Sequence, residues 1–321
     1  MEKVIITGGA GFIGSHLAEE LVSKGHEVTV VDNLFDGKRE NLDGVKDKIH
    51  FIEGDIRDKK LMNELCSNAD HILHQAARRS VPASLKDPFE YNDVNINGTL
   101  NILEAARRND IKSVVFASSS SVYGEVKEEN LPQKETMTPG PMSPYALTKV
   151  AGEHYLSMYN KLYGLKTISL RYFNVFGPRQ DPNSQYAVVI PLFVKALMEG
   201  KQPVIYGDGE QSRDFTYIKN VVNGNILAMN AKEKAGGEVF NMANGHAVSV
   251  NDLLDRIKRI LGGKAMEIEA KHEGPRAGDV RHTLADNSKA KDILGYEEEV
   301  GFDDGLRTTV EWFRENLKNP E

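Results

Sequence analysis

The segment TGGAGFIG, residues 7–14, constrains the fold of this chain more than any other feature. It directly continues the apolar, β-rich run KVIIT at residues 3–7, and a helical pattern extends from about Phe12 to Lys24. Glycines in this spacing permit a tight turn between strand and helix, and they let a ligand approach the backbone at the helix N-terminus. The segment therefore predicts a strand–turn–helix unit whose helix begins at an anion-binding end.

Short β-rich runs alternate with helical patterns through the first half of the chain. Further strands are predicted at residues 26–32, 48–55, 69–77, 111–120 and 166–174. Runs such as VTVV and SVVF are apolar at every position, which is typical of strands buried on both faces of a parallel sheet. This order predicts an α/β fold built on a Rossmann-type doubly wound parallel sheet.

The pattern changes after residue 173. Loop-forming stretches GPRQDPNSQ and YGDGEQSRD flank the helical run VIPLFVKALMEG, whereas GEVFNMA at 237–243 has the pattern of one more sheet strand. We therefore expect a nucleotide-binding Rossmann domain and a smaller mixed α/β lobe for the substrate. The expected bounds are 1–173 plus about 217–247 for the domain, and about 174–216 plus 248–321 for the lobe.

Composition excludes several classes of function. The net charge of −7 over 321 residues argues against a nucleic-acid partner, which requires a basic face. Cys66 is the single cysteine, so an intrachain disulfide and cysteine-pair metal sites are excluded, and the nine histidines show no ligand spacing. We expect no metal site. The sequence shows neither a signal segment nor an apolar stretch of about 20 residues, which predicts a cytoplasmic protein without a membrane partner.

The glycine segment fits a dinucleotide. Its glycines at 8, 11 and 14 form G-x-x-G-x-x-G, and those at 9, 11 and 14 satisfy G-x-G-x-x-G. Asp32 ends the second strand about 20 residues further on, where the pattern requires an acidic side chain. A carboxylate there accepts both ribose hydroxyls of NAD and repels a 2′-phosphate, so NAD is predicted rather than NADP. Asp55, which ends the third strand, is expected near the adenine.

The segment SPYALTK, residues 143–149, places a tyrosine and a lysine one helical turn apart. Ser143 is a good N-cap and Pro144 suits the first helical position, so Tyr145 and Lys149 are expected on one helix face. A phenol beside an ammonium has its anion favoured, so the pKa of Tyr145 is expected to fall from about 10 toward neutral pH. The pair indicates a base. Packing of Tyr145 beside a solvated Lys149 is the alternative that this segment alone leaves open.

Several motifs in order resemble the extended branch of the short-chain dehydrogenase/reductase superfamily. Besides TGGAGFIG and SPYALTK, FASSSSVYG at 116–124 resembles its active-site strand, and NINGT from Asn95 its structural asparagine motif. RYFNVFGPRQDP, YGDGEQSRDFTYI and RAGDVRHTLAD resemble the sugar-nucleotide lobe of UDP-hexose 4-epimerases. The resemblance extends from Lys3 to about Tyr296. It is closest to epimerases that accept UDP-N-acetylhexosamines.

This resemblance implies a catalytic set and a cofactor site. Tyr145 would take the proton of the sugar 4-hydroxyl, Lys149 would bind the nicotinamide ribose, and Ser119 would hydrogen-bond the sugar oxygen. NAD would end the reaction as it began and would stay bound as a prosthetic group. The residues implied for NAD are Gly8, Gly11, Phe12, Ile13, Gly14, Asp32, Asn33, Asp55, Ile56, Gln75, Ala76, Ala77, Asn95, Tyr145 and Lys149.

It also implies a substrate site. Asn174 and Arg213 match positions that hold the diphosphate, and Arg276 matches the arginine of the family's R-x-G-D segment; the planar fork of arginine is suited to phosphate oxygens. Tyr206 matches an aromatic position against the nucleoside, Asp279 is expected at the ribose, and Gln180 at an acetamido group. The residues implied for the UDP-sugar are Ser119, Ser121, Tyr145, Asn174, Gln180, Tyr206, Arg213, Arg276, Asp279 and Thr283.

The choice among related reactions depends on which side chains are missing. Sugar-nucleotide dehydratases and uronate decarboxylases carry carboxylates before the VYG segment, where this chain has Ser120 and Ser121. Thr283 stands where epimerases restricted to UDP-glucose and UDP-galactose often have tyrosine, which leaves room for a 2-acetamido group. We therefore predict C4 epimerisation of UDP-glucose/UDP-galactose and also of UDP-GlcNAc/UDP-GalNAc.

Two alternatives stay open at this point. A UDP-glucuronate 4-epimerase is the first; Asn174, typically threonine in that group, argues against it. Arg78 and Arg79 are unusual at their positions and would contact the NAD pyrophosphate, a substrate carboxylate or solvent. A non-catalytic NAD-sensing protein is the second. The resemblance further predicts a homodimer that packs the helix near 92–109 and the SPYALTK helix into a four-helix bundle.

Overall fold

The computed structural model describes residues 1–181, 189–274 and 280–317. Within them, one parallel sheet has the strand order β11-β6-β5-β4-β1-β2-β3. The strands are β1 (Lys3–Thr7), β2 (Glu27–Asp32), β3 (Ile49–Glu53), β4 (His71–His74), β5 (Ser113–Ser119), β6 (Thr167–Tyr172) and β11 (Val239–Met242). The chain order reverses on either side of β1, so the predicted doubly wound Rossmann-type sheet is confirmed.

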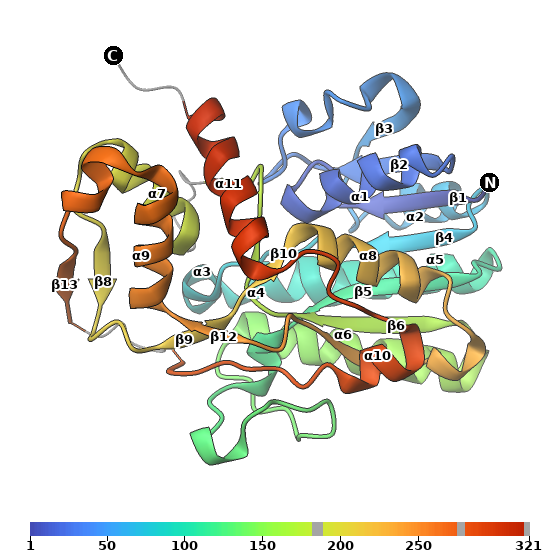
Figure 1. Cartoon of the computed structure of the whole chain (residues 1–321). Helices are drawn as coiled ribbons and strands as arrows, with labels where there is room; N and C mark the ends of the chain where they lie inside the picture. Colours follow the sequence, from blue (N-terminus) through green and yellow to red (C-terminus); the bar gives the residue numbers. More distant parts are fainter. Residues whose placement is uncertain (182–188, 275–279, 318–321) are drawn as a thin grey trace.

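Helices cover both faces of this sheet (Figure 1). One face packs against α1 (Phe12–Ser23) and α8 (Ile218–Met229), in a core that contains Leu17, Leu21 and Val221. The other packs against α2 (Lys59–Cys66), α5 (Gly98–Arg108) and α6 (Pro144–Tyr163), in a core that contains Ile102 and Leu156. Burial on both faces explains why the strands are apolar at successive positions.

Short turns and short helices connect these longer elements. They comprise the 3₁₀ turns η1 (Arg39–Leu42), η2 (Lys46–Lys48), η4 (Ser120–Tyr123) and η5 (Glu128–Asn130), the helices α3 (Val81–Lys86) and α4 (Pro88–Asn92), and the π-helical turn η3 (Asp93–Asn97). The strand predicted at 69–77 is shorter in the structure. It ends at His74; the Gln75 N–H still donates to the Thr7 carbonyl oxygen of β1 at 3.1 Å, and the chain then continues as a loop at the carboxyl edge of the sheet.

A smaller lobe lies beside the sheet domain, on the left of Figure 1. Its short ladders pair β7 (Val175–Phe176) with β10 (Thr216–Tyr217), β8 (Val204–Tyr206) with β13 (Lys271–Glu273), and β9 (Ser212–Asp214) with β12 (Ala247–Ser249). Its other elements are α7 (Val189–Met198), α9 (Val250–Leu261), η7 (Gly263–Glu267) and α11 (Phe302–Asn316). Two further elements, η6 (Glu233–Ala235) and α10 (Ser288–Leu294), contact each other, and α10 also contacts β11 of the sheet. The exact domain boundaries remain a proposal.

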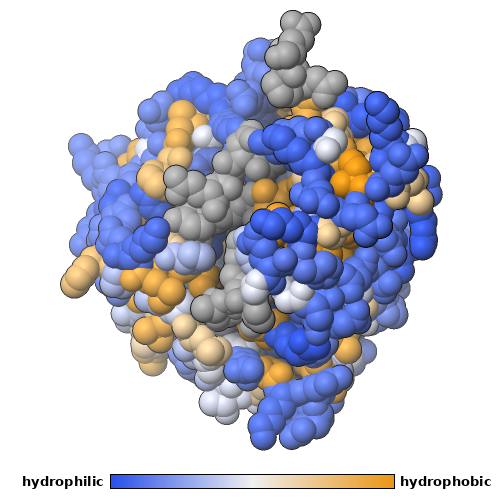
Figure 2. Space-filling view, turned by 90° about the vertical axis from the view of Figure 1, so that its left-hand side faces the viewer, coloured by the Kyte–Doolittle hydropathy of each residue, from blue (hydrophilic) through white to orange (hydrophobic). Residues whose placement is uncertain are grey.

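The surface is largely hydrophilic on the side of the smaller lobe, where hydrophobic residues gather in separate patches (Figure 2). Among the helices of the described ranges, none combines the length and the apolar character that a bilayer crossing requires.

Candidate active site

The glycine segment joins β1 to α1 in a turn that tolerates no side chain. Gly8 has φ 69°, and a β-carbon there would lie 2.7 Å from the backbone nitrogen of Ala76. A β-carbon on Gly14 would lie 2.3 Å from the Gly8 carbonyl oxygen. The N-cap of α1 is Gly11, and no side chain of the described residues caps it. An uncapped helix N-terminus at the carboxyl edge of a parallel sheet fits a pyrophosphate.

Asp32 anchors this turn to the end of β2. Its carboxylate accepts hydrogen bonds from the backbone N–H of Ala10 at 3.0 Å and of Leu34 at 2.8 Å. Burial raises the pKa of Asp32, and the two backbone N–H groups oppose that shift. Asp32, which is predicted to bind the ribose, therefore lies at the end of β2 next to the glycine turn. Its hydrogen bonds also hold that turn in shape.

The predicted adenine end is built around Asp55. Arg57 donates to both of its carboxylate oxygens, at 3.0 and 2.8 Å, and Asn33 Nδ2 donates at 3.0 Å. Mainly through the Arg57 hydrogen bonds, the pKa of Asp55 falls to about 2. Arg57 was missed by the sequence analysis; its place two residues after Asp55 in the GDIR run was the available signal. Ile56 is buried, and its side chain fills the space that a β-carbon on Gly98 would need.

His74 links the start of the glycine turn to α5. Its Nδ1 lies 2.8 Å from Thr7 Oγ1, and its Nε2 lies 3.0 Å from Thr99 Oγ1. The Thr99 hydroxyl donates to the Asn95 carbonyl oxygen at 2.6 Å, so it must accept from His74 Nε2–H. Burial lowers the pKa of His74 to about 3, so the ring is neutral and structural.

Asn95 continues this chain of hydrogen bonds to the helix that carries Tyr145. Its Nδ2 donates to Thr148 Oγ1 at 3.0 Å, and the Thr148 hydroxyl donates to the Tyr145 carbonyl oxygen at 2.7 Å. Its Oδ1 accepts from the Arg78 N–H at 2.7 Å. Asn95 lies in the π-helical turn, a distortion that often marks functional positions.

Tyr145 lies in the first turn of α6, as predicted. The Ser143 hydroxyl caps the Ala146 N–H at 3.2 Å, and Pro144 occupies the first helical position. The Tyr145 phenol lies near Ser119, at the carboxyl end of β5, and its ring meets Tyr91 edge-to-face at 6.4 Å. The Ser119 hydroxyl also accepts from Ser121 Oγ at 2.9 Å. The structure thus brings the predicted serines and tyrosine together.

Lys149 is buried and faces the same edge. Its Nζ donates to the Ala117 carbonyl oxygen at 2.8 Å and lies 5.8 Å from the Tyr145 ring centroid. Burial lowers the pKa of Lys149 to about 7, against the opposing charge of Glu153. Burial also raises the pKa of Tyr145, and the groups that oppose this are Ser119 and Arg79. The prediction that Lys149 lowers the pKa of Tyr145 is therefore wrong for this structure, because its ammonium points to a backbone carbonyl.

The substrate side begins at the end of β6. Asn174, with φ 32°, donates from Nδ2 to the Asp214 carbonyl oxygen at 3.1 Å and to Thr283 Oγ1 at 3.2 Å. The Asp214 carboxylate is fully buried and accepts from the N–H groups of Asn244, Gly245 and Ala285. Burial raises its pKa to about 7. Asn174 and Thr283, predicted from separate motifs, are therefore direct neighbours.

The other predicted substrate residues are distributed more widely. Gln180 is buried; its Nε2 donates to the Val175 carbonyl oxygen at 2.9 Å, and its Oε1 has no partner among the described residues. Arg213 donates to the Ser212 and Arg281 carbonyl oxygens. Tyr206 ends β8, where it pairs with Glu273 of β13. Arg276 and Asp279 lie outside the described residues.

Arg78 and Arg79 join the loops that flank the glycine turn. The Arg78 guanidinium lies over the Phe35 ring, 3.0 Å from its centroid, and donates to Glu90 at 2.6 Å. Arg79 pairs with Asp36 at 3.6 Å. Because β1 lies between β2 and β4, these contacts connect the two loops on either side of the predicted pyrophosphate position. Arg79 is about half exposed, and its contact with the cofactor, with a substrate carboxylate or with solvent stays a prediction.

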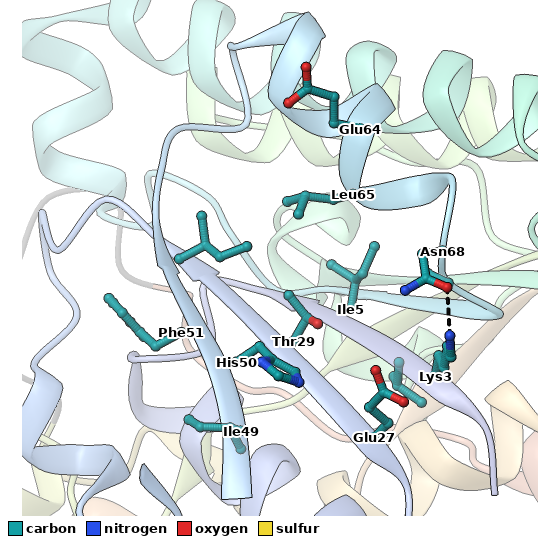
Figure 3. Close-up of a pocket in the computed structure, with 13 residues that line it drawn as sticks. Lys3, Ile5, Glu27, Thr29, Ile49, His50, Phe51, Glu64, Leu65 and Asn68 are labelled. Atoms are coloured by element: carbon teal, nitrogen blue, oxygen red, sulfur yellow. Dashed lines mark hydrogen bonds between the residues drawn. The ribbon is translucent and has the colours of Figure 1, made fainter. Parts of the chain in front are cut away.

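A groove of about 560 Å³ lies away from these residues (Figure 3). It is formed by β1, β2, β3 and α2, toward the amino-terminal halves of the strands, and Lys3 Nζ donates to Asn68 Oδ1 across its rim at 2.5 Å. Polar residues such as Glu27, Thr29 and His50 line it, which is typical of a sheet face exposed to solvent. No cluster of three metal-ligating side chains occurs in the described part of the chain.

A profile of the NAD dependent epimerase/dehydratase family matches residues 4–243. The chain belongs to this family. The UDP-glucose 4-epimerase of Mycolicibacterium smegmatis is 39% identical over 316 residues, which cover 97% of this chain and 98% of that protein. Membership in the epimerase/dehydratase family confirms the predicted resemblance and NAD as the cofactor.

Two solved structures extend the comparison. The UDP-N-acetylglucosamine 4-epimerase from Methanobrevibacter ruminantium, in complex with UDP-N-acetylmuramic acid, is 42% identical, with a TM-score of 0.92 and 98% of both chains covered. The UDP-glucuronic acid 4-epimerase from Bacillus cereus, in complex with UDP-glucuronic acid and NAD, is 32% identical, with a TM-score of 0.89, covering 98% of this chain and 99% of that one. Relatives in the epimerase/dehydratase family thus differ in their sugars.

Proposed function

We propose that this protein interconverts the C4 epimers of UDP-hexoses through a 4-keto sugar, with NAD as its bound cofactor. The observation that carries the proposal is that Ser119, the Tyr145 phenol and the buried Lys149 come together at the carboxyl edge of the sheet. The relatives named above are 4-epimerases of UDP-glucose, UDP-N-acetylglucosamine and UDP-glucuronate. The proposal therefore names the reaction type that they share.

The cofactor site follows the carboxyl edge from β3 to β5. The first-turn N–H groups of α1 would hold the pyrophosphate, Asp32 and Asn33 the adenosine ribose, and Asp55 and Ile56 the adenine. The loop after β4 and the end of α6 would hold the nicotinamide half. The full proposed set is Gly8, Gly11, Phe12, Ile13, Gly14, Asp32, Asn33, Asp55, Ile56, Gln75, Ala76, Ala77, Asn95, Tyr145 and Lys149.

The proton chemistry falls to Tyr145. NAD, when bound, would supply the hydride acceptor and donor for C4 of the sugar. Tyr145 would accept the proton of the 4-hydroxyl and return it to the 4-keto oxygen, while the Ser119 hydroxyl orients that oxygen. The Lys149 ammonium would bind the ribose hydroxyls of the nicotinamide half next to Tyr145.

Dehydration and decarboxylation require groups that this strand end does not carry. A dehydratase needs carboxylates next to the reacting carbons, and here the two residues before the VYG segment are Ser120 and Ser121. The Ser121 hydroxyl donates to Ser119 Oγ instead of carrying a proton for C5 chemistry. Epimerisation needs neither carboxylate, so these serines support the proposed reaction.

The preferred substrates are neutral UDP-hexoses, including N-acetylated ones. Thr283 is small and lies beside Asn174, which supports room for a 2-acetamido group in the pocket. Arg213 and Tyr206 would hold the diphosphate and the nucleoside, and Gln180 is proposed near the acetamido group. Arg276 and Asp279 complete the proposed substrate set from outside the described residues.

A UDP-glucuronate 4-epimerase is the second candidate, and Arg79 is the observation that favours it. Its charge acts on Tyr145, and its side chain is about half exposed in the structure. A guanidinium near the reacting hydroxyl would attract a C6 carboxylate. The relative from Bacillus cereus that binds UDP-glucuronic acid supports this alternative.

A homodimer is proposed on the exposed side of α6. Leu147, Met158 and Leu162 are exposed there, and their spacing of 11 and 4 residues places them on one stripe of the helix. Exposed Leu85 and Phe89 on α3 and α4 add to the apolar surface. Light scattering should give twice the chain mass at micromolar concentration. A monomeric mass would contradict the proposed dimer.

The proposed function is tested by incubating the purified protein, with no NAD added, with UDP-GlcNAc, UDP-glucose or UDP-GlcA. Proton NMR of the anomeric region reports each C4 epimer. We expect UDP-GalNAc and UDP-galactose. Conversion of UDP-GlcA alone would establish the second candidate, and no conversion even with added NAD would favour an NAD-sensing protein.

A further inference from the structure

Glu153 is a buried carboxylate one helical turn beyond Lys149. Its carboxylate accepts hydrogen bonds from Ser118 Oγ at 2.5 Å, and from Arg171 Nε at 2.8 Å and Nη2 at 2.7 Å. The side chain is 6% exposed, and that of Arg171 is 3% exposed. The proposed roles of Tyr145, Lys149 and Ser119 do not use this group.

The Glu153 carboxylate and the Lys149 ammonium are both hydrogen-bonded to β5, at two neighbouring residues of that strand. Lys149 Nζ donates to the Ala117 carbonyl oxygen at 2.8 Å, and the next residue, Ser118, donates to Glu153. Residues at i and i+4 lie on one helix face, so both side chains point from α6 toward β5. Three hydrogen bonds leave the Glu153 carboxylate little freedom to move away from Lys149.

A lysine in this position needs a nearby anion to stay charged. Lys149 is 3% exposed, and its Nζ lies 4.8 Å from the Phe116 ring centroid. Removing an ammonium from water favours the neutral amine, which can no longer donate three hydrogen bonds to a ligand. The proposed catalytic role of Lys149 requires the charged form.

We propose that Glu153 is a positioning residue that keeps Lys149 charged, so that its ammonium can hold the cofactor ribose beside Tyr145. Arg171 and Ser118 fix the carboxylate so that its charge acts on Lys149 rather than on solvent. The inference rests on the proposed function, because it assigns Glu153 a task only if Tyr145 and Lys149 work as a pair.

Among the described residues, Glu153 is the anion whose charge acts on Lys149; the other titratable groups near Lys149 are neutral or positively charged. On α6 the remaining titratable neighbour is Tyr145. From β4, neutral His74 faces Lys149, and from β6 the Arg171 cation is paired with Glu153. Glu153 is also the group whose charge opposes the fall in the pKa of Lys149 that burial causes.

The test compares Glu153→Gln with Glu153→Asp. Glutamine keeps the size of the side chain and removes its charge, whereas aspartate keeps the charge and shortens the chain. Turnover of UDP-GlcNAc is measured from pH 5.5 to 9.5. We expect Glu153→Gln to move the alkaline limb of the profile down by about one pH unit, a tenfold loss on that limb, because a neighbouring anion favours the ammonium. Glu153→Asp should keep the limb within a few tenths of a unit of the wild-type value.

A second measurement does not depend on turnover. Lysine labelled with ¹³C at Cε gives an NMR titration in which Lys149, identified with a Lys149→Met variant, should titrate lower in Glu153→Gln than in wild type. Arg171→Gln disturbs the same buried pair with the opposite charge change, so it should move the titration of Lys149 upward. Opposite shifts in the two variants would separate an electrostatic role of Glu153 from a loss of packing. If Glu153→Gln does not fold, the direction of the Lys149 shift in Arg171→Gln tests the electrostatic role.

The results distinguish the inference from the function. The role of Glu153 would be overturned if the Lys149 titration moved in the same direction in Glu153→Gln and Arg171→Gln, or moved in neither variant. This conclusion would hold even if wild-type turnover is normal. An inactive wild type would remove the proposed function instead, while the NMR titration would still report whether Glu153 holds the charge of Lys149.

Discussion

Asn174 and Thr283 are joined directly, with Asn174 Nδ2 donating to Thr283 Oγ1 at 3.2 Å although 109 residues separate them. The same threonine oxygen accepts the Asp214 N–H at 3.2 Å. This contact ties the end of β6 to the segment that carries the proposed size gate. A change at Thr283 therefore alters both the space in the pocket and the hold on Asn174.

Thr283→Tyr should suppress turnover of UDP-GlcNAc by about tenfold or more relative to UDP-glucose, since an added ring in a buried site costs about 1–3 kcal/mol where it collides with the substrate. kcat/KM for both sugars is the measurement. Thr283→Val is the matched control, because it removes the bond to Asn174 without adding bulk. An equal fall for both sugars in Thr283→Tyr would show that the pocket account is wrong.

Arg79→Gln should move the acid limb of kcat/KM to higher pH. The Arg79 charge lowers the pKa of Tyr145, so its removal raises that pKa, and the phenolate then forms only at higher pH. Because the side chain is about half exposed, we expect a shift of roughly half a pH unit or less. Lys86→Gln, on the exposed side of α3, serves as a control for total charge. A shift toward lower pH would contradict the assignment.

Phe35→Ala should speed release of NAD. Its ring lies under the Arg78 guanidinium and is exposed to solvent on its other side. A cation–π contact of this kind contributes about 0.5–1 kcal/mol, which corresponds to a roughly two- to fivefold faster release. Release of NAD into an excess of a second NAD-binding enzyme measures the rate, with Phe89→Ala as the exposed aromatic control. Equal rates in both variants would argue against a link between the two loops.

His74 should make the protein less stable in mild acid. Its pKa is lowered to about 3 in the folded protein, so below pH 6.5 the unfolded chain binds a proton that the folded chain does not. As the pH falls below 6.5, the free energy of unfolding decreases by about 1.4 kcal/mol per pH unit. Above pH 6.5 His74 causes no such loss of stability. Urea unfolding at pH 7 and pH 5.5 measures this loss, which His74→Gln should reduce. The same loss in His74→Gln would assign it to other groups.

Local patterns predicted the features that depend on neighbours in the chain. The glycine turn after β1, the Ser143 cap of α6 and the apolar strands each follow from residues within one or two turns. The resemblance to a family placed Ser119 and Tyr145 together. Contacts between distant loops, such as Phe35 with Arg78, have no local signal. The orientation of Lys149 toward Ala117 was not predicted, because burial and the carbonyl direction emerge only in the folded chain.

The most direct test of the account is the turnover of UDP-GlcNAc by Tyr145→Phe beside wild type, followed by anomeric proton NMR with bound NAD quantified in both samples. Removal of the phenol hydroxyl should reduce epimer formation by at least about 100-fold, since a positioned acid–base group contributes that much, while bound NAD stays at the wild-type level. Epimer formation at the wild-type rate in Tyr145→Phe would contradict the central claim that Tyr145 moves the proton of the 4-hydroxyl.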